Sequence, residues 1–306
     1  MGTPDFAVES LKQLIEAGIE VAAVVTAPDR PAGRGQQIRE SAVKQFAKSH
    51  DIKVLQPEKL KSEEFHHQLK TLAADLFVVV AFRMLPEVVW SMPPLGTINL
   101  HGSLLPNYRG AAPINWAVIN GEKETGATTF FIEKEIDTGK IIDHVKVPIG
   151  ENDSAGTVHD QLMVKGATLL KDTVLQIFEG NVKAISQDDL FDETHQHAPK
   201  IFKADCKIEW NLSANQIHNK IRGLSPYPTA WTEFMINGKK KSIKLFESRK
   251  KHDGQNHSGE IKLADSLLIG CGDGWIEILQ LQVEGKKRMK AADFILGYQQ
   301  AQIELA

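Results

Sequence analysis

The residues with the clearest chemical potential are Asn99 and His101, which stand two positions apart at the end of the apolar run TINLH (97–101). Residues two apart on a strand project from the same face. An asparagine amide can donate to an oxygen that gains negative charge, and a neighbouring imidazole can donate a second hydrogen bond or transfer a proton. Such a pair suits the transfer of an acyl group through a tetrahedral intermediate.

This chemistry also needs a carboxylate, to orient the histidine or to help deprotonate the nucleophile. Asp137 is the candidate, because the segment EIDTGK places it in a turn between two strand-like segments. The chain contains no G-x-S-x-G motif, and neither Cys206 nor Cys271 is near the pair in sequence. We therefore expect the acceptor molecule itself to make the attack. Spacing alone leaves one alternative open, in which the strand-end histidine is a structural hydrogen-bonding residue.

The surrounding sequence alternates between helix and strand patterns. Short apolar runs rich in valine, which suit buried parallel strands, are separated by segments with apolar residues at helical spacing. This alternation predicts an α/β domain with a Rossmann-like parallel sheet wrapped by helices, and the functional crevice of such sheets lies beyond the carboxyl ends of the strands. Strands are predicted within 20–27, 53–57, 76–82, 97–101, 128–136 and 139–149, and helices within 4–18, 41–50, 62–74, 111–121 and 155–179.

The start of the chain departs from this pattern. A domain of this kind should open with a buried strand, but Met1 is followed at once by GTPDF, a turn that leads into a helix. We expect the native gene product to carry about six to ten further residues ahead of Met1, the usual length of a strand.

The length of 306 residues fits two domains. We expect a catalytic domain over 1–180, a polar linker over 181–204 and a C-terminal domain over 205–306. In the C-terminal part a short helix (213–224) precedes five strand-length segments separated by turn signals, which predicts a small β-barrel of the OB type. These segments are AWTEFMI, KSIKLFES, GEIKLAD, SLLIGCG and WIEILQLQV.

Composition is that of an ordinary soluble protein, with 42% hydrophobic and 25% charged residues. No apolar stretch is long enough to span a bilayer, and the N-terminus lacks a secretory pattern. Two cysteines suit a reducing compartment, so we expect a cytoplasmic protein without a membrane partner. The HQH segment (195–197) lies in polar sequence without further ligands at metal-binding spacing, so we expect no metal.

Charge is distributed unevenly along the chain. Residues 201–306 carry 16 basic and 12 acidic side chains, a net charge of +4, whereas residues 1–200 carry 20 basic and 27 acidic side chains, a net charge of −7. The basic residues gather in 238–251 and 285–290. Two interpretations stay open from charge alone: solvated loops, or a patch for a polyanion such as nucleic acid.

The stretch NLHGSLLPNYRGAAPINW, together with Asp137 in IDTG, closely resembles the folate-dependent formyltransferases. The resemblance implies that Asn99, His101 and Asp137 are the catalytic trio and that 10-formyltetrahydrofolate is the formyl donor. Asn99 and His101 would stabilise the oxyanion, while Asp137 would hold the histidine and help to remove the proton of the attacking amine. The loop that contacts the folate would consist of Ser103, Leu104, Leu105 and Pro106.

Two further stretches resemble the branch of this family that acts on methionyl-tRNA. These are GTPDFAV (2–8) and APDRPAGRGQQ (27–37), and Arg34 matches an arginine that engages the tRNA. LSPYPTAW (224–231) and IGCGDG (269–274) fit the C-terminal domain less selectively. The resemblance implies a monomer that formylates initiator methionyl-tRNA for translation initiation. The expected tRNA contacts are Arg34, Lys239, Lys240 and Lys241.

Two alternatives remain at this point. The amino-sugar formyltransferases share the NLHGSLLP core and a comparable second domain, so the acceptor could be an amino-sugar nucleotide. The chain could also be an RNA-binding relative that has lost catalysis, although the intact trio argues against this. Formyltransferases that act on glycinamide ribonucleotide are shorter and lack a second domain.

Overall fold

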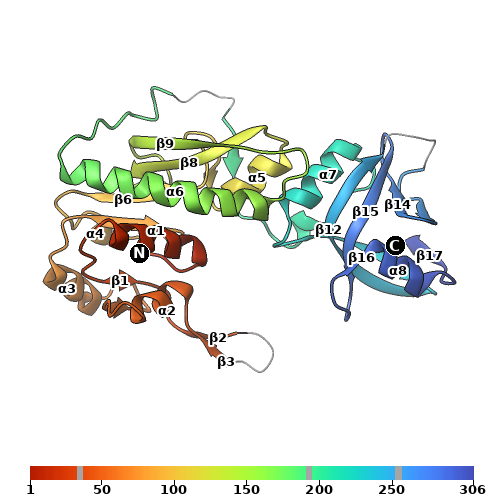
Figure 1. The fold of residues 1–306 in the computed structure, drawn as a ribbon, viewed down its shortest axis with the longest axis horizontal. Coiled ribbons are helices and arrows are strands. Elements are labelled where there is room, and N and C mark those ends of the chain that lie inside the picture. The colour runs from red at the N-terminus through yellow and green to blue at the C-terminus, as the bar shows by residue number, and fades with distance from the viewer. Residues whose placement is uncertain (33–36, 191–194, 252–256) are drawn as a thin grey trace. The chain divides into compact units, whose positions relative to one another are not determined.

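The computed structural model describes residues 1–32, 37–190, 195–251 and 257–306, which form two compact units (Figure 1). The first unit contains residues 1–110, 126–147 and 160–197, and the second contains residues 111–125, 148–159 and 198–306. The predicted domain bounds stay a prediction. The compact units differ from them because two short segments of the N-terminal half pack with C-terminal residues.

The sheet of the first unit has the order β5-β6-β8-β9. β5 and β6 are parallel, with Phe77 opposite Thr97, whereas β8 is antiparallel to β6, with Thr128 opposite His101. β1 and β4 form a second parallel pair. The parallel strands confirm the predicted α/β class, and β8 adds an antiparallel strand to it. The bounds are β1 Val24–Val25, β4 Val54–Leu55, β5 Phe77–Val80, β6 Thr97–His101, β8 Glu124–Phe131 and β9 Ile141–Pro148.

The first two residues connect the two parallel pairs. Gly2 donates its backbone N–H to the carbonyl of Val25 at 3.0 Å, and Val80 donates to the carbonyl of Met1 at 2.9 Å. Gly2 also forms a parallel bridge with Val80. Met1 and Gly2 therefore lie between β1 and β5, where a first strand was expected. The expectation of further residues ahead of Met1 stays a prediction.

The predicted helices of the first two-thirds of the chain are confirmed, with small shifts at their ends. Ser41 begins one of them, because its hydroxyl accepts a hydrogen bond from the backbone N–H of Lys44. The four-residue helix α4, which follows Pro86, was not predicted because it is too short to show a period. The helices are α1 Asp5–Glu16, α2 Ala42–Lys48, α3 Glu63–Leu72, α4 Glu87–Trp90, α5 Pro113–Ile119 and α6 Ala155–Phe178. In the part of the chain that the structure describes, no helix has the length and apolar character needed to cross a membrane.

The second unit is an antiparallel, barrel-like sheet with the order β13-β14-β15-β12-β11-β17, and β16 pairs with β15. All five predicted strands are confirmed, while β16, β17 and α8 were not predicted. Buried and partly exposed residues alternate along β11, as expected for a strand with one face in the core. The strands are β11 Ala230–Ile236, β12 Lys239–Lys251, β13 Ile261–Leu263, β14 Leu267–Gly270, β15 Trp275–Val283, β16 Met289–Lys290 and β17 Ile303–Leu305.

Helix α7 (Ala214–Gly223) covers this sheet and confirms the predicted short helix. It begins with a capping box, in which the Ser213 hydroxyl and the Gln216 side chain each bond to the other's backbone N–H. The carboxylate of Asp273 accepts a further bond from the N–H of Ala214 at 2.6 Å. This unit also contains α5, the short 3-10 turn η1 (Ala204–Cys206) and α8 (Ala291–Tyr298).

Candidate active site

Strand β6 carries the predicted Asn99–His101 pair at its carboxyl end. Successive side chains of a strand alternate between its two faces, so Asn99 and His101 share the face opposite the buried Leu100. His101 is also buried, with 6% of its surface exposed, whereas Asn99 is partly exposed. The Asn99 amide forms no hydrogen bond with any residue that the structure describes. It is therefore free to donate to a ligand.

The imidazole of His101 is held by a backbone carbonyl. Its Nε2 lies 2.8 Å from the carbonyl oxygen of Tyr108. Because a carbonyl only accepts, Nε2 carries the proton and donates it. The ring also makes an edge contact with Phe130, with the centroids 6.5 Å apart and an interplanar angle of 87°. Nδ1 is thus the ring nitrogen left for chemistry, and it faces Asp137.

Asp137 reaches the histidine from the turn between β8 and β9. Its Oδ2 lies 3.7 Å from Nδ1 of His101 and accepts a hydrogen bond from the backbone N–H of Gly110 at 2.9 Å. The backbone of Asp137 is left-handed, with φ +57°, a conformation that aspartate tolerates better than most residues. The structure therefore brings all three predicted catalytic residues to one place.

The predicted folate loop is tied down by its own polar groups. The hydroxyl of Ser103, which is fully buried, donates to the carbonyl of Asn107 at 2.6 Å. Thr128 donates its hydroxyl to the carbonyl of Ser103 at 2.7 Å and accepts the N–H of Leu105 at 3.1 Å. Pro106 is buried, and Leu104 is the loop residue with a partly exposed side chain. Ser103 therefore holds the loop in shape, and Leu104 offers the accessible apolar surface.

Three polar groups at this site were not predicted. They are the carbonyl of Tyr108, the N–H of Gly110 and the side chain of Gln187. Gly110 belongs to the two-residue strand β7 (Arg109–Gly110), and the Arg-Gly pair in NYRGAAP was a local signal for it. Gln187 lies in the predicted linker, ahead of the two-residue strand β10 (His197–Ala198), and nothing in the neighbouring sequence marks it.

Arg109 is the cation closest in sequence to the site. Burial lowers the pKa of its guanidinium, while the carboxylates of Asp188, Asp137 and Glu135 oppose this shift. Its Nε and Nη2 donate to the Gln187 side chain at 3.0 and 2.7 Å. The Arg109 guanidinium is thus connected to the Asp137 turn through the side chain of Gln187.

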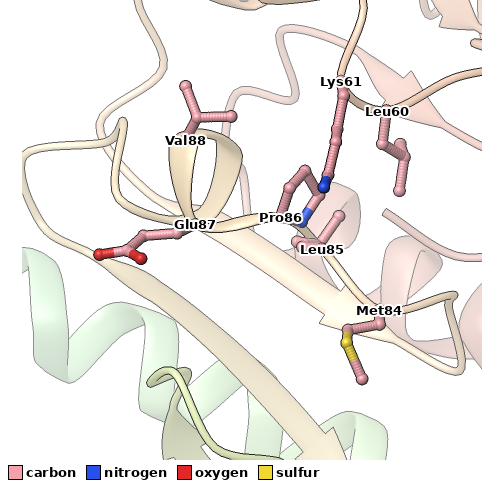
Figure 2. A pocket seen from close by; sticks show the side chains of 7 residues that line it. All are labelled: Leu60, Lys61, Met84, Leu85, Pro86, Glu87 and Val88. Atoms are coloured by element: carbon pink, nitrogen blue, oxygen red, sulfur yellow. The ribbon is translucent and has the colours of Figure 1, made fainter.

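A hollow of about 480 Å³ lies between residues 60–61 and the loop that follows β5 (Figure 2). Leu60 and Lys61 form one side, and the segment 84–88, which leads into α4, forms the other. Met84 is 71% exposed, which is unusual for so large an apolar side chain. β5 and β6 are parallel, so the loop that leaves β5 starts at the same edge of the sheet as the carboxyl end of β6. The segment RMLPEVV (83–89) mixes charged and apolar residues and gave no sequence signal for this hollow.

The predicted tRNA contacts are only partly described. Arg34 lies outside the described residues, between strands β2 (Arg30–Ala32) and β3 (Gln37–Arg39), which form an antiparallel hairpin that was not predicted. Lys239, Lys240 and Lys241 begin β12, where alternation puts Lys240 on the opposite face from the other two. Lys240 forms an ion pair of 3.1 Å with Glu233.

No group of three or more histidine, cysteine, aspartate or glutamate side chains is arranged to hold a metal ion within the described ranges. This includes His195 and His197 of the HQH segment. The polar groups of the site are instead an amide, an imidazole and a single carboxylate, a set suited to hydrogen bonding and proton transfer.

Comparison with known proteins places the chain among formyl transferases. The family model described as formyl transferase matches residues 1–174, and the model of the formyl transferase C-terminal domain matches residues 200–299. The chain is 51% identical to a methionyl-tRNA formyltransferase of Bacteroides thetaiotaomicron, over 97% of this chain and 94% of that protein. It is 54% identical to a methionyl-tRNA formyltransferase of Azobacteroides pseudotrichonymphae, with the same coverage of both chains.

Solved structures share the fold at low identity. The sugar 3N-formyl transferase WlaRD, in the presence of dTDP and 5-N-formyl-THF, has a TM-score of 0.66 at 22% identity, covering 94% of this chain and 97% of that chain. The N-formyltransferase from Helicobacter canadensis, in complex with folinic acid and dTDP-3-aminofucose, has a TM-score of 0.64 at 21% identity and the same coverage. These similarities concern the fold alone.

Proposed function

The chain belongs to the formyl transferase family, and we propose that it transfers the formyl group of 10-formyltetrahydrofolate to the α-amino group of initiator methionyl-tRNA. The observation that carries the chemistry is the placement of Asn99 and His101 at the end of β6 with the carboxylate of Asp137 beside the imidazole. Relatives that are 51% and 54% identical in sequence are named methionyl-tRNA formyltransferases, and this supports methionyl-tRNA as the acceptor. The proposal includes a monomeric protein that acts in the cytoplasm during translation initiation.

The reaction needs two bond changes and one net proton transfer. The amine nitrogen attacks the formyl carbon, and the carbonyl oxygen becomes an oxyanion to which the Asn99 amide donates. Nδ1 of His101 donates to the same oxygen when the ring carries a second proton, because the first is held on Nε2 by the Tyr108 carbonyl. The amine loses its proton toward Asp137, directly or through water. The bond from the formyl carbon to the donor nitrogen then breaks, and that nitrogen takes a proton as tetrahydrofolate leaves. Two donors aimed at one oxyanion supply the electrostatic stabilisation.

The donor would lie across the carboxyl ends of β5 and β6. The loop Ser103–Pro106 borders the Asn99–His101 pair, and the apolar hollow beside residues 84–88 offers space for a flat ring. Two solved proteins with the same fold were determined with 5-N-formyl-THF or folinic acid, which supports a folate as the donor. No metal is needed for this chemistry, because the amide and imidazole stabilise the developing charge.

The acceptor is tested by supplying radiolabelled 10-formyltetrahydrofolate with one of three acceptors. These are initiator methionyl-tRNA, elongator methionyl-tRNA and a dTDP-amino sugar. We expect formylation of the initiator tRNA at the highest kcat/KM. Preferred formylation of the amino sugar would replace the proposed acceptor while keeping the chemistry. Binding of tRNA without formylation of any acceptor would favour a catalytically silent RNA-binding relative.

A further inference from the structure

Gln187 is a buried residue in a segment that was predicted to be a polar linker. Only 1% of its surface is exposed, although glutamine is rarely found fully buried in proteins. It also lies between the two ranges that match the family models, which end at residue 174 and resume at residue 200. Its burial therefore needs an explanation in the local structure.

The side-chain amide of Gln187 uses its full hydrogen-bonding capacity. Nε2 donates to the carbonyl oxygens of Asp137 at 3.0 Å and Gly139 at 2.7 Å. Oε1 accepts from Nε and Nη2 of Arg109 at 3.0 and 2.7 Å. An amide offers two donors and two acceptor sites, and all four are matched. A carboxylate or an apolar side chain of the same length cannot make this set of bonds.

The turn that Gln187 holds is the one that carries Asp137. Asp137 has a left-handed backbone, which costs free energy that the surrounding structure must offset. Gly139 presses against the end of β8, because a Cβ placed there would lie 1.7 Å from the carbonyl oxygen of Phe131. Gln187 binds the two carbonyls that flank Thr138, so the turn is fixed from both sides.

Gln187 also completes a second connection between the turn and the Arg109–Gly110 strand. The first connection is the bond from the Gly110 N–H to Oδ2 of Asp137. The second runs from Arg109 through the Gln187 amide to the backbone of Asp137. One bond orients the carboxylate and the other positions the backbone that carries it.

The position of Gln187 is itself set by strand pairing. Ile185 and Ile141 exchange backbone hydrogen bonds of 2.8 and 2.9 Å, which attach this segment to the start of β9. β9 begins two residues after Gly139. The glutamine is therefore anchored to the same strand that ends the Asp137 turn.

We propose that Gln187 is a positioning residue for formyl transfer, which holds the Asp137 turn so that the carboxylate faces Nδ1 of His101. The proposal rests on the proposed function for its kinetic consequences only. Gln187 touches no reacting atom, so its loss should lower kcat through misplacement of Asp137 and leave the KM values for donor and tRNA unchanged. A misplacement of about 1 Å typically costs about a hundredfold in rate.

Two variants test the proposal. Gln187→Glu keeps the shape and the Arg109 contact but turns acceptor oxygens toward the carbonyls of Asp137 and Gly139. Gln187→Met keeps the length and removes all four bonds. Gln302→Glu makes the same chemical change at an exposed glutamine and is the matched control. Melting temperature, kcat, both KM values and the ring-nitrogen NMR shifts of His101 at one fixed pH are measured for each protein and for Asp137→Asn.

We expect both Gln187 variants to fold, to lose at least about tenfold in kcat with KM values within about twofold of wild type, and to move the His101 ring shifts in the direction seen for Asp137→Asn. A folded variant with wild-type kcat and unchanged His101 shifts would overturn the proposal. So would the failure of both variants to fold, since the role would then be structural. If wild type formylates no acceptor, the proposed function fails, and the His101 shifts still decide whether Gln187 positions Asp137.

Discussion

Nδ1 of His101 lies 3.7 Å from Oδ2 of Asp137, while the same carboxylate oxygen accepts the backbone N–H of Gly110 at 2.9 Å. The first separation is within ion-pair range but too long for a hydrogen bond, and the second is an ordinary hydrogen bond. The carboxylate is thus oriented by Gly110 and acts on the imidazole through its charge. The imidazole is oriented independently, by the carbonyl of Tyr108.

The three proposed catalytic residues should act as one unit. We expect Asn99→Ala, His101→Ala and Asp137→Ala each to lower kcat by at least about a hundredfold. The double variant His101→Ala/Asp137→Ala should be far less impaired than the product of the two single effects, because both residues serve one transition state. Asn181→Ala, at an exposed site, is the control. A stable Asn99→Ala protein with near-normal turnover in a formylation assay would contradict the assignment.

Gly139 should be intolerant of a side chain. A Cβ there would lie 1.7 Å from the carbonyl oxygen of Phe131, so Gly139→Ala must displace the Asp137 turn. We expect a loss of about 1–3 kcal/mol in the free energy of unfolding, typical of overpacking, together with a lower kcat. Gly297→Ala, within α8, is the matched control, because apart from its chain neighbours and its own helix backbone no described atom lies within 4 Å of a Cβ at that position. Denaturant unfolding of both variants measures the difference, and equal stability would argue against the turn geometry.

The stability of the protein should depend on pH through His218. Burial lowers the pKa of this imidazole, whose Nε2 donates to the carbonyl of Glu151 and whose Nδ1 faces the Ser248 hydroxyl. The hydrogen bond to the Glu151 carbonyl opposes this shift in pKa, the positive charges of Arg222 and Lys250 add to the shift, and the Glu151 carboxylate opposes it. Below the ordinary pKa of 6.5, the unfolded chain therefore binds a proton that the folded protein excludes.

The stabilisation from neutral His218 should thus be complete above about pH 6.5 and decline as the pH falls toward the lowered pKa. We expect the free energy of unfolding of wild type to fall more steeply between pH 7 and pH 5 than that of His218→Gln, by at most about 1.4 kcal/mol per pH unit. Urea unfolding at each pH measures both slopes. Parallel slopes would mean that His218 does not titrate differently in the folded and unfolded states.

The lysines at the start of β12 should contribute to tRNA binding through phosphates. We expect tRNA affinity to fall as salt rises, and the triple alanine variant of Lys239, Lys240 and Lys241 to reduce the salt slope by up to about 0.9 for each phosphate that the variant no longer neutralises. Lys240 should contribute least, because it already pairs with Glu233. A triple alanine variant of Lys12, Lys59 and Lys70, all exposed in the other unit, is the control. Affinity that is indifferent to salt would remove the tRNA interface from this face.

Replacement of Arg34 should distinguish binding of the tRNA acceptor from binding of the folate donor. We expect Arg34→Ala to raise KM for methionyl-tRNA several-fold while leaving the affinity for the folate donor unchanged, because an arginine that binds the nucleic acid affects the binding of that partner alone. Arg39→Ala, at the end of the same hairpin, is the comparison variant. Wild-type kinetics of Arg34→Ala with tRNA would shift the proposed acceptor toward the amino sugar.

Much of the fold followed from local patterns. The valine-rich run that became β5 and the helical spacing that became α3 and α6 are properties of short segments, so periodicity predicted them. The same holds for the alternating strands β11 and β15 of the C-terminal sheet. Short elements such as α4 and β16 could not be predicted, because a few residues cannot display a period.

The candidate active site could likewise be predicted from the sequence only in part. Asn99 and His101 are two residues apart on one strand, so their shared face could be inferred without a structure, and the EIDTGK turn offered Asp137 as the carboxylate. The groups that hold them were found only in the folded chain: the carbonyl of Tyr108, the N–H of Gly110 and the amide of Gln187. Backbone groups have no side-chain signature, and Gln187 lies 50 residues beyond the aspartate whose carbonyl it binds. Contacts over such separations form only when the whole chain has folded, and no local pattern encodes them.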